Sequence, residues 1–103
     1  MKGRNPTKAE KMHMDSVRSL GCIVCRNQGK NINAEIHHTV GKTKPNAHFL
    51  VLPLCPQHHR YGRHEEPISR HPYKKRFENA YGTEEELLKQ VEELLENQTD
   101  LIF

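Results

Sequence analysis

Three cysteines and one histidine form two pairs with the same spacing. Cys22 and Cys25 stand three residues apart, and so do Cys55 and His58. Two ligands at this spacing can both reach one tetrahedral ion across a tight turn. We therefore predict a Cys3His zinc site, and a structural one, because the protein fills all four positions and leaves none for a substrate. The alternative is that the thiols are buried free cysteines acting as small apolar side chains.

A second motif consists of the Glu-Ile-His-His segment at residues 35–38 together with His59, which directly follows the second zinc pair, and its histidines are the candidates for chemistry. A strand with adjacent histidines and a histidine on a later helix can place imidazoles around one divalent ion. One imidazole then remains to take a proton from water. Phosphodiester cleavage needs both functions, a metal that neutralises charge at the phosphate and a base with a pKa near neutrality.

The remaining histidines fall into two groups. His48 and His71 are further candidates for this second site, whereas we expect His13 and His64 to be ordinary surface residues. The alternative for the whole set is a scatter of surface imidazoles on a histidine-rich chain.

The composition explains why a metal would be needed. The chain has 103 residues, which allows one small domain, and only 34% of them are hydrophobic, with no tryptophan. A core this small usually requires a disulfide or a metal as an added crosslink. Three cysteines cannot all pair, and eight histidines are many for this length. These counts favour metal over disulfides as the crosslink, and they indicate a reducing compartment.

Hydropathy and charge indicate the compartment and the partner. No stretch approaches the roughly 18 consecutive apolar residues of a membrane span, and no apolar signal-peptide core is seen, so we expect a cytoplasmic protein with no membrane partner. Residues 1–30 carry seven Lys/Arg and two acids, residues 31–76 carry eight and three, and residues 77–103 carry one and eight. The basic part favours DNA as a partner, although a solvated basic face has the same composition.

The elements that must position these ligands follow from caps and periodicity. We predict a helix over residues 7–20, where Thr7 and Glu10 form a capping box and Gly21 ends the helix. Residues 34–40 and 48–54 read as strands, and a short helix is expected from Pro56 to about Tyr61. The fold class is therefore α+β.

Two further helices are expected in the last third of the chain. The first covers residues 72–81, with Pro72 at its first position. The second covers residues 83–98 and is acidic on its outer face, with a capping box of Thr83 and Glu86. Its apolar stripe consists of Leu87, Leu88, Val91, Leu94 and Leu95. We expect residues 1–6 to be a short basic arm and residues 7–103 to form one domain, with its core at about 20–82.

The order CxxC, then E-x-H-H, then L-C-x-x-(C/H)-H resembles the HNH, or His-Me finger, endonucleases. The resemblance implies a zinc-stapled ββα-metal core with flanking helices. It also implies that His37 and His59 bind a catalytic divalent ion (Mg2+, Mn2+ or Zn2+) and that His38 activates water. We expect His71 to be a further ligand of this ion. The middle Asn of the HNH pattern falls on apolar residues near Leu50. Asn46 and His48 both remain candidates for its supporting role.

The resemblance is closer to the phage recombination-enhancement (Ref) nucleases. It rests on residues 36–48 and 52–55, His71-Pro72, residues 76–78 and Tyr81-Gly82, and it extends over about residues 20–90. This similarity implies a phage or prophage protein in a bacterial host that cuts DNA where a RecA filament has paired a strand with its target.

These patterns together predict a metal-dependent DNA endonuclease, acting as a nickase with weak sequence specificity. The residues expected to bind phosphates are Lys42, Lys44, Arg60, Arg63, Lys74, Lys75 and Arg76. One competing class is a non-catalytic zinc module that binds DNA or a recombination protein. Another is a recombination accessory factor that docks through its acidic helix and the Leu101-Ile102-Phe103 tail.

Overall fold

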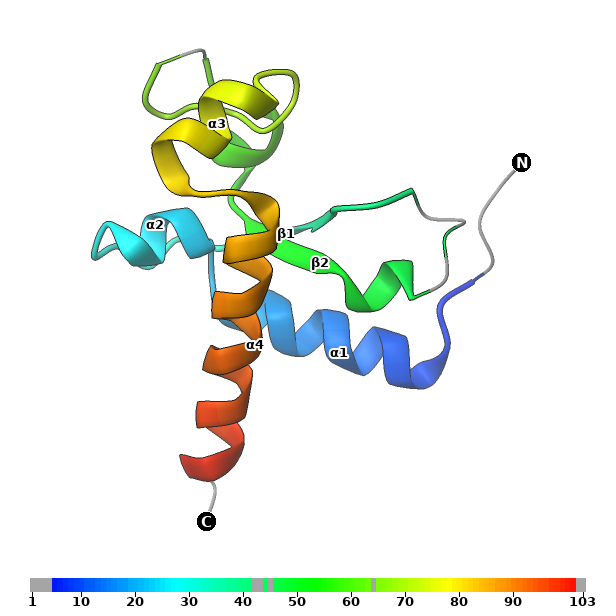
Figure 1. Ribbon diagram of the computed structural model, residues 1–103. Helices are drawn as coiled ribbons and strands as arrows, with labels where there is room; N and C mark the ends of the chain where they lie inside the picture. Colours follow the sequence, from blue (N-terminus) through cyan, green and yellow to red (C-terminus); the bar gives the residue numbers. More distant parts are fainter. Residues whose placement is uncertain (1–4, 42–43, 45, 64, 102–103) are drawn as a thin grey trace.

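The computed structural model describes residues 5–41, 44, 46–63 and 65–101, with side chains as far as residue 97. The chain is a small α+β protein built on a two-stranded antiparallel hairpin (Figure 1). Its elements are α1 (Lys8–Ser19), α2 (Ile23–Asn27), β1 (Glu35–His38), η1 (Ala47–Phe49), β2 (Val51–Leu54), η2 (Gln57–Tyr61), α3 (Lys74–Tyr81) and α4 (Glu84–Leu101).

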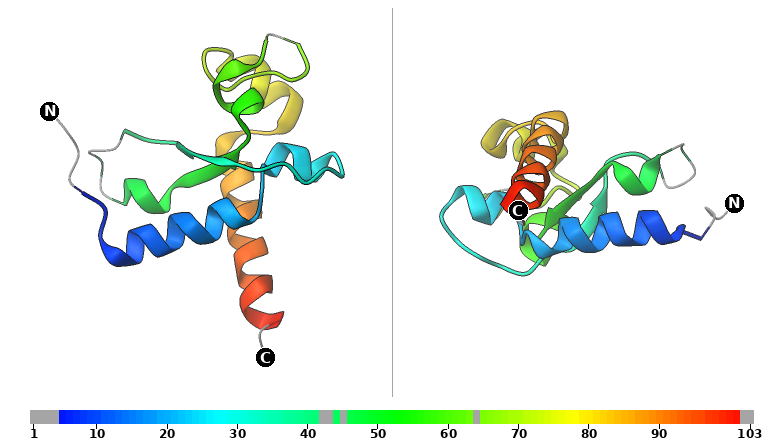
Figure 2. Two further views of the ribbon diagram at one scale, coloured as in Figure 1. Left: turned by 180° about the vertical axis from the view of Figure 1, so that it is seen from behind. Right: turned by 90° about the horizontal axis from the view of Figure 1, so that it is seen from below.

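The helices surround the hairpin on several sides. Helix α1 runs along the hairpin, and α4 passes across it from the end where α3 and η2 lie (Figures 1 and 2). Buried apolar side chains come from α1, α2, β2, α3 and α4 and include Val17, Ile23, Leu52, Phe77 and Val91. The core therefore lies between α1, α2, β2, α3 and α4, and the hairpin is its centre.

The register of the hairpin fixes the surroundings of the two adjacent histidines. His37 pairs with Leu52 and His38 with Val51. Successive side chains on a strand point to opposite faces. His37 is accordingly 2% exposed, while His38 is only partly buried.

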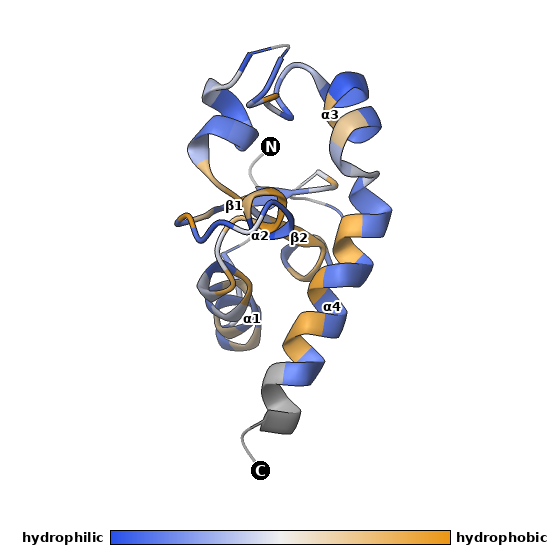
Figure 3. Ribbon diagram, turned by 90° about the vertical axis from the view of Figure 1, so that its left-hand side faces the viewer, coloured by the Kyte–Doolittle hydropathy of each residue, from blue (hydrophilic) through white to orange (hydrophobic). Residues whose placement is uncertain are grey.

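Both long helices begin at the predicted capping boxes. The side chain of Thr7 accepts a hydrogen bond from the backbone N–H of Glu10 at 3.1 Å, and Glu10 accepts in return from Thr7. Thr83 and Glu86 make the same reciprocal pair at the start of α4. Leu87 and Val91 of α4 are buried against the core, and the apolar stripe of this helix faces α1 and the hairpin (Figure 3).

Three details differ from the sequence prediction. Residues 23–27 form a short helix, α2, where only a tight turn between Cys22 and Cys25 was expected. The second strand starts at Val51, because residues 47–49 form the 3-10 turn η1, which buries His48. Helix α3 starts at Lys74 instead of Pro72, since residues 70–72 form a turn after which the N–H of Tyr73 bonds back to the carbonyl of Ser69.

Of the remaining elements, both strands and the helical turn after β2 are confirmed in kind, and Gly82 caps α3 with a φ of 106°. Residues 1–4 of the predicted basic arm, Lys42 and His64 lie outside the described residues. Across the described part of the chain, no helix is long and apolar enough to span a membrane.

Gly62 joins η2 to the loop that leads to α3, and no larger residue fits there. A Cβ atom at this position would lie 2.3 Å from the carbonyl oxygen of Gln57 and 2.4 Å from that of Pro67. Both neighbours are backbone atoms, so the substitution must move either η2 or the loop.

We expect Gly62→Ala to lower the free energy of unfolding by about 1–3 kcal/mol, the usual cost of overpacking. Urea denaturation measures this change. Gly41→Ala is the matched control, because a Cβ at Gly41 meets only the flexible side chain of Lys44 at 3.9 Å. Equal stability of the two variants would contradict the prediction.

Candidate metal centres

Cys22, Cys25, Cys55 and His58 form one buried cluster. The Sγ atoms of Cys25 and Cys55 lie 3.8 Å apart, and Nδ1 of His58 lies 3.2 Å, 3.5 Å and 3.8 Å from the sulfurs of Cys55, Cys25 and Cys22. Zn–S bonds of about 2.3 Å and Zn–N bonds of about 2.0–2.1 Å in a tetrahedron give about 3.8 Å between sulfurs and about 3.6 Å between sulfur and nitrogen. The four side chains therefore fit a tetrahedral ion.

Local backbone structure brings the first two ligands together. Gly21 adopts a φ of +76°, a conformation that glycine tolerates best, and turns the chain from α1 into the cluster. Cys22 then caps α2, and its sulfur accepts the N–H of Cys25 at 3.5 Å. The N–H of Cys22 bonds to the carbonyl of Ile32 at 2.8 Å, which fixes the first ligand against the following loop.

Burial keeps two thiols of this cluster protonated when no ion is bound. Burial raises the pKa of the Cys22 and Cys25 thiols above the usual range. Thiolates are the species that ligate zinc, so a cation is needed to hold these sulfurs deprotonated at neutral pH.

His58 is oriented from its other nitrogen by a carboxylate. Nε2 of His58 lies 3.0 Å from Oε1 of Glu66, and the second oxygen of Glu66 accepts hydrogen bonds from Tyr81 and Gln28. Desolvation acts to raise the pKa of Glu66, but these hydrogen bonds outweigh it and lower the pKa. An ionised Glu66 favours the tautomer in which Nδ1 of His58 carries the lone pair that faces the sulfurs.

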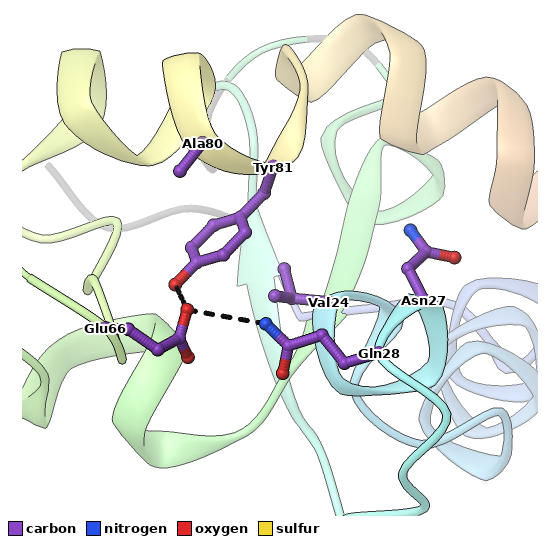
Figure 4. Close-up of a pocket in the computed structure, with 6 residues that line it drawn as sticks. All are labelled: Val24, Asn27, Gln28, Glu66, Ala80 and Tyr81. Atoms are coloured by element: carbon purple, nitrogen blue, oxygen red, sulfur yellow. Dashed lines mark hydrogen bonds between the residues drawn. The ribbon is translucent and has the colours of Figure 1, made fainter.

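A pocket of about 430 Å³ adjoins this hydrogen-bond network, between α2 and α3 (Figure 4). Glu66, Tyr81 and Gln28 point toward one another in it, and Val24, Asn27 and Ala80 complete its lining. The polar side chains of this pocket already have hydrogen-bond partners. Glu66 accepts from Tyr81 and Gln28, and Asn27 exchanges hydrogen bonds with Gln90.

A second cluster joins three histidines from different segments. His37 comes from β1, His59 from η2 and His71 from the loop before α3, and one ligand atom from each lies within 4.8 Å of the others. Their ring centroids are 5.1–5.3 Å apart. Backbone hydrogen bonds from Arg70 to the carbonyl of His58 and from His71 to that of His59 hold the loop against η2. These three side chains offer a second set of metal ligands.

The imidazoles of this cluster are suited to bind a cation. Burial is the main cause that lowers the pKa of both His59 and His71, and the cation of Arg70 adds to the effect at His71. A lowered pKa keeps these rings neutral at pH 7, and the neutral imidazole is the form that ligates metals.

Two carboxylates flank this histidine cluster. Oε1 of Glu35 lies 2.7 Å from Nδ1 of His59, and both Glu35 oxygens accept hydrogen bonds from Arg60 at 2.8–3.0 Å. Oε2 of Glu84, at the start of α4, lies 2.5 Å from Nε2 of His37. Sequence reasoning quoted Glu35 in a motif without giving it a role, and it missed Glu84 entirely.

His38 has a different neighbour from His37. Nε2 of His38 lies 2.9 Å from Nδ1 of His48, and the two rings meet edge to face. His48 is 7% exposed, and its own Nε2 is buried with no hydrogen-bond partner among the residues that the structure describes. Asn46, the other candidate for a supporting role, is exposed, and its backbone is left-handed with a φ of 63°.

The residues expected to bind phosphates are only partly available. Lys44, Arg63, Lys74, Lys75 and Arg76 are exposed. Arg60 is exposed as well, but its guanidinium is engaged by Glu35 and lies over the ring of Tyr61. Lys42 falls outside the described residues.

Fold and site together define a small basic α+β protein with two groups of candidate metal ligands around one hairpin. A family model described as recombination enhancement, RecA-dependent nuclease matches residues 6–96. The chain belongs to this family of RecA-dependent nucleases, whose name makes DNA its expected substrate and RecA its expected partner.

Loss of one cysteine ligand tests the first cluster. We expect Cys55→Ser to bind about one equivalent of zinc less than the wild type, because a hydroxyl does not replace a thiolate at such a site. We also expect its thermal unfolding to shift to lower temperature, because metal binding and folding are coupled. Elemental analysis and circular dichroism measure the two effects.

His13→Gln is the control, since His13 lies on α1 against Phe49 and outside both clusters. It should keep the zinc content of the wild type. Full zinc occupancy in Cys55→Ser would contradict the assignment of the four ligands.

Proposed function

We propose that the protein is a metal-dependent DNA endonuclease of the HNH type, a RecA-dependent nickase whose nuclease domain spans residues 7–103. The observation that carries the proposal is the convergence of His37, His59 and His71 next to His38, the residue that follows His37 on β1. In this assignment β1, β2 and η2 are the ββα-metal core, and the Cys3His cluster holds a structural zinc.

The three histidines would hold a divalent ion, and because the ligands are imidazoles, Zn2+ suits them at least as well as Mg2+ or Mn2+ does. Such an ion supplies positive charge at the scissile phosphate and at the leaving oxygen. Glu35 holds the ring of His59 through its Nδ1. The remaining nitrogen of that ring keeps its lone pair for the ion.

His38 is the proposed general base. Its Nε2 lies 2.9 Å from Nδ1 of His48, so His48 orients the ring, and the neutral imidazole would accept a proton from the attacking water. His48 takes the supporting role of the missing HNH asparagine, because it fixes the ring orientation of His38. Its burial in η1 supports this role over that of the exposed Asn46.

DNA would be held by phosphate contacts. The exposed Lys74, Lys75 and Arg76 at the start of α3 follow the loop that carries His71, and Lys44 and Arg63 extend the basic surface. Phosphate contacts position a duplex without reading its sequence. We therefore assign specificity to the RecA-paired strand that the family name implies.

The first test of this function is a nicking assay. Supercoiled plasmid is incubated with a RecA-coated complementary oligonucleotide and Mg2+, Mn2+ or Zn2+, with EDTA and omission of RecA as controls. We expect nicking by the wild type and a fall of about 10²–10⁴-fold in His38→Ala, the usual contribution of a general base. His59→Ala should lose activity as well, because it removes a ligand.

The competing hypothesis is a non-catalytic zinc module that binds DNA or a recombination protein. A gel shift without nicking under any of these conditions would favour the module. Equal nicking by the wild type and a folded His38→Ala variant would remove His38 from the mechanism.

A second prediction separates the two candidates for the supporting role. We expect His48→Ala to lower kcat by up to about 10²-fold, the effect of a misplaced catalytic group, while the structural zinc and the second metal remain bound. Asn46→Ala should keep wild-type kcat. Single-turnover cleavage measures both variants, and a larger loss in Asn46→Ala would reverse the assignment.

A further inference from the structure

Glu84 is a buried carboxylate that no sequence motif marks. It is the first residue of α4, and it is 8% exposed. Its Oε2 lies 2.5 Å from Nε2 of His37 and accepts a hydrogen bond from Nε of Arg70 at 2.7 Å. A buried charge is costly unless it is paired and hydrogen-bonded, and Glu84 meets both conditions at the edge of the histidine cluster.

The position of this carboxylate is fixed from both ends. The backbone N–H of Glu84 donates to Oε2 of Glu78 on α3 at 3.0 Å, and the capping box of Thr83 and Glu86 sets where α4 starts. Arg70 holds the side chain, and the N–H of Arg70 is itself bonded to η2 at the carbonyl of His58. The carboxylate therefore connects α4, the His71 loop and β1.

The surroundings of Glu84 favour its ionised form. Arg70 carries a permanent positive charge, and its Nε donates to Oε2 of Glu84 at 2.7 Å, so the carboxylate is paired with a cation. An ionised carboxylate favours the His37 tautomer that carries its proton on Nε2. The lone pair is then on Nδ1, where it is available to a metal ion.

We propose that Glu84 is a positioning residue for the metal site: it fixes the ring and the tautomer of His37, and it makes the start of α4 part of that site. This inference rests on the proposed function, in which His37 is a metal ligand. Glu84 is not assigned as a ligand, because its Oε2 and Nε2 of His37 are in hydrogen-bonding contact, too close for both atoms to bind one ion.

Substitutions at Glu84 separate positioning from ligation. Because a single oxygen accepts from both His37 and Arg70, the carbonyl oxygen of glutamine can keep both hydrogen bonds. We expect Glu84→Ala to raise the Kd for the second metal by about 10- to 100-fold, and Glu84→Gln to stay within about threefold of the wild type. Glu85→Ala is the matched control, an exposed glutamate in the same helical turn.

The experiment uses the full chain with one equivalent of zinc bound, titrated with Co2+ in a calorimeter. Circular dichroism confirms the fold of each variant. Long-range 1H–15N spectra record the tautomer of His37. We expect protonation at Nε2 in the wild type and in Glu84→Gln, and no preference for this tautomer in Glu84→Ala.

Each outcome bears on the inference. Wild-type metal affinity in Glu84→Ala overturns it. An equal loss of metal affinity in Glu84→Gln and Glu84→Ala also overturns it, because it would show that the carboxylate itself binds the ion and that glutamine cannot replace it. If the wild type itself takes up no second ion, or if His59→Ala binds Co2+ as the wild type does, the proposed metal site fails and the role of Glu84 with it. If the wild type binds Co2+ and the Glu84 variants bind it equally well, only the positioning role of Glu84 is refuted and the metal site stands.

Discussion

The arrangement of both metal centres depends on the helical turn η2, which places His58 and His59 side by side in the chain but in different clusters. The turn η2 is π-helical, and neighbouring residues on a helix project in different directions around its axis. His58 therefore reaches the sulfurs of the Cys cluster, while His59 reaches His37 and His71. Any ion that fixes the first cluster also fixes the backbone that carries the second. In the proposed assignment, an ion in the Cys3His cluster would therefore act on the histidine cluster through the single peptide bond that joins His58 to His59.

The small core explains why this turn needs such support. Only 34% of the residues are hydrophobic, and a chain of this size buries a limited apolar area. The Cys22–Cys25 turn, the end of β2 and η2 meet at the first cluster, where several of the most buried residues also lie. A metal ion there would connect residues 30 or more positions apart, and this crosslink would replace apolar contacts that the sequence does not supply. Removal of the ion would accordingly affect the position of His59 before it affected α1 or α4.

Local sequence patterns predicted much of the fold, but they did not predict most of the side chains that hold the histidines of the two clusters. Capping boxes predicted the starts of α1 and α4, because they depend on residues three positions apart. The burial of His48 in η1 was not predicted, since a 3-10 turn inside an apolar stretch has the same composition as a strand. Glu84 was missed for a related reason: it stands beside Glu85 and Glu86, and only the tertiary contact with Arg70 and His37 distinguishes it.

A common device orients the imidazoles of both clusters. His58 has Glu66 on its second nitrogen, His59 has Glu35 and His37 has Glu84. Carboxylates in this position set the tautomer and increase the basicity of the ligating nitrogen. His71 differs, because its hydrogen-bond neighbour is the cation of Arg70, at 3.4 Å, and the residue is exposed. The histidine cluster is therefore firmly held on its β1 and η2 sides and open to solvent on the side of His71. A phosphate reaching the site from the basic start of α3 would approach along that open side.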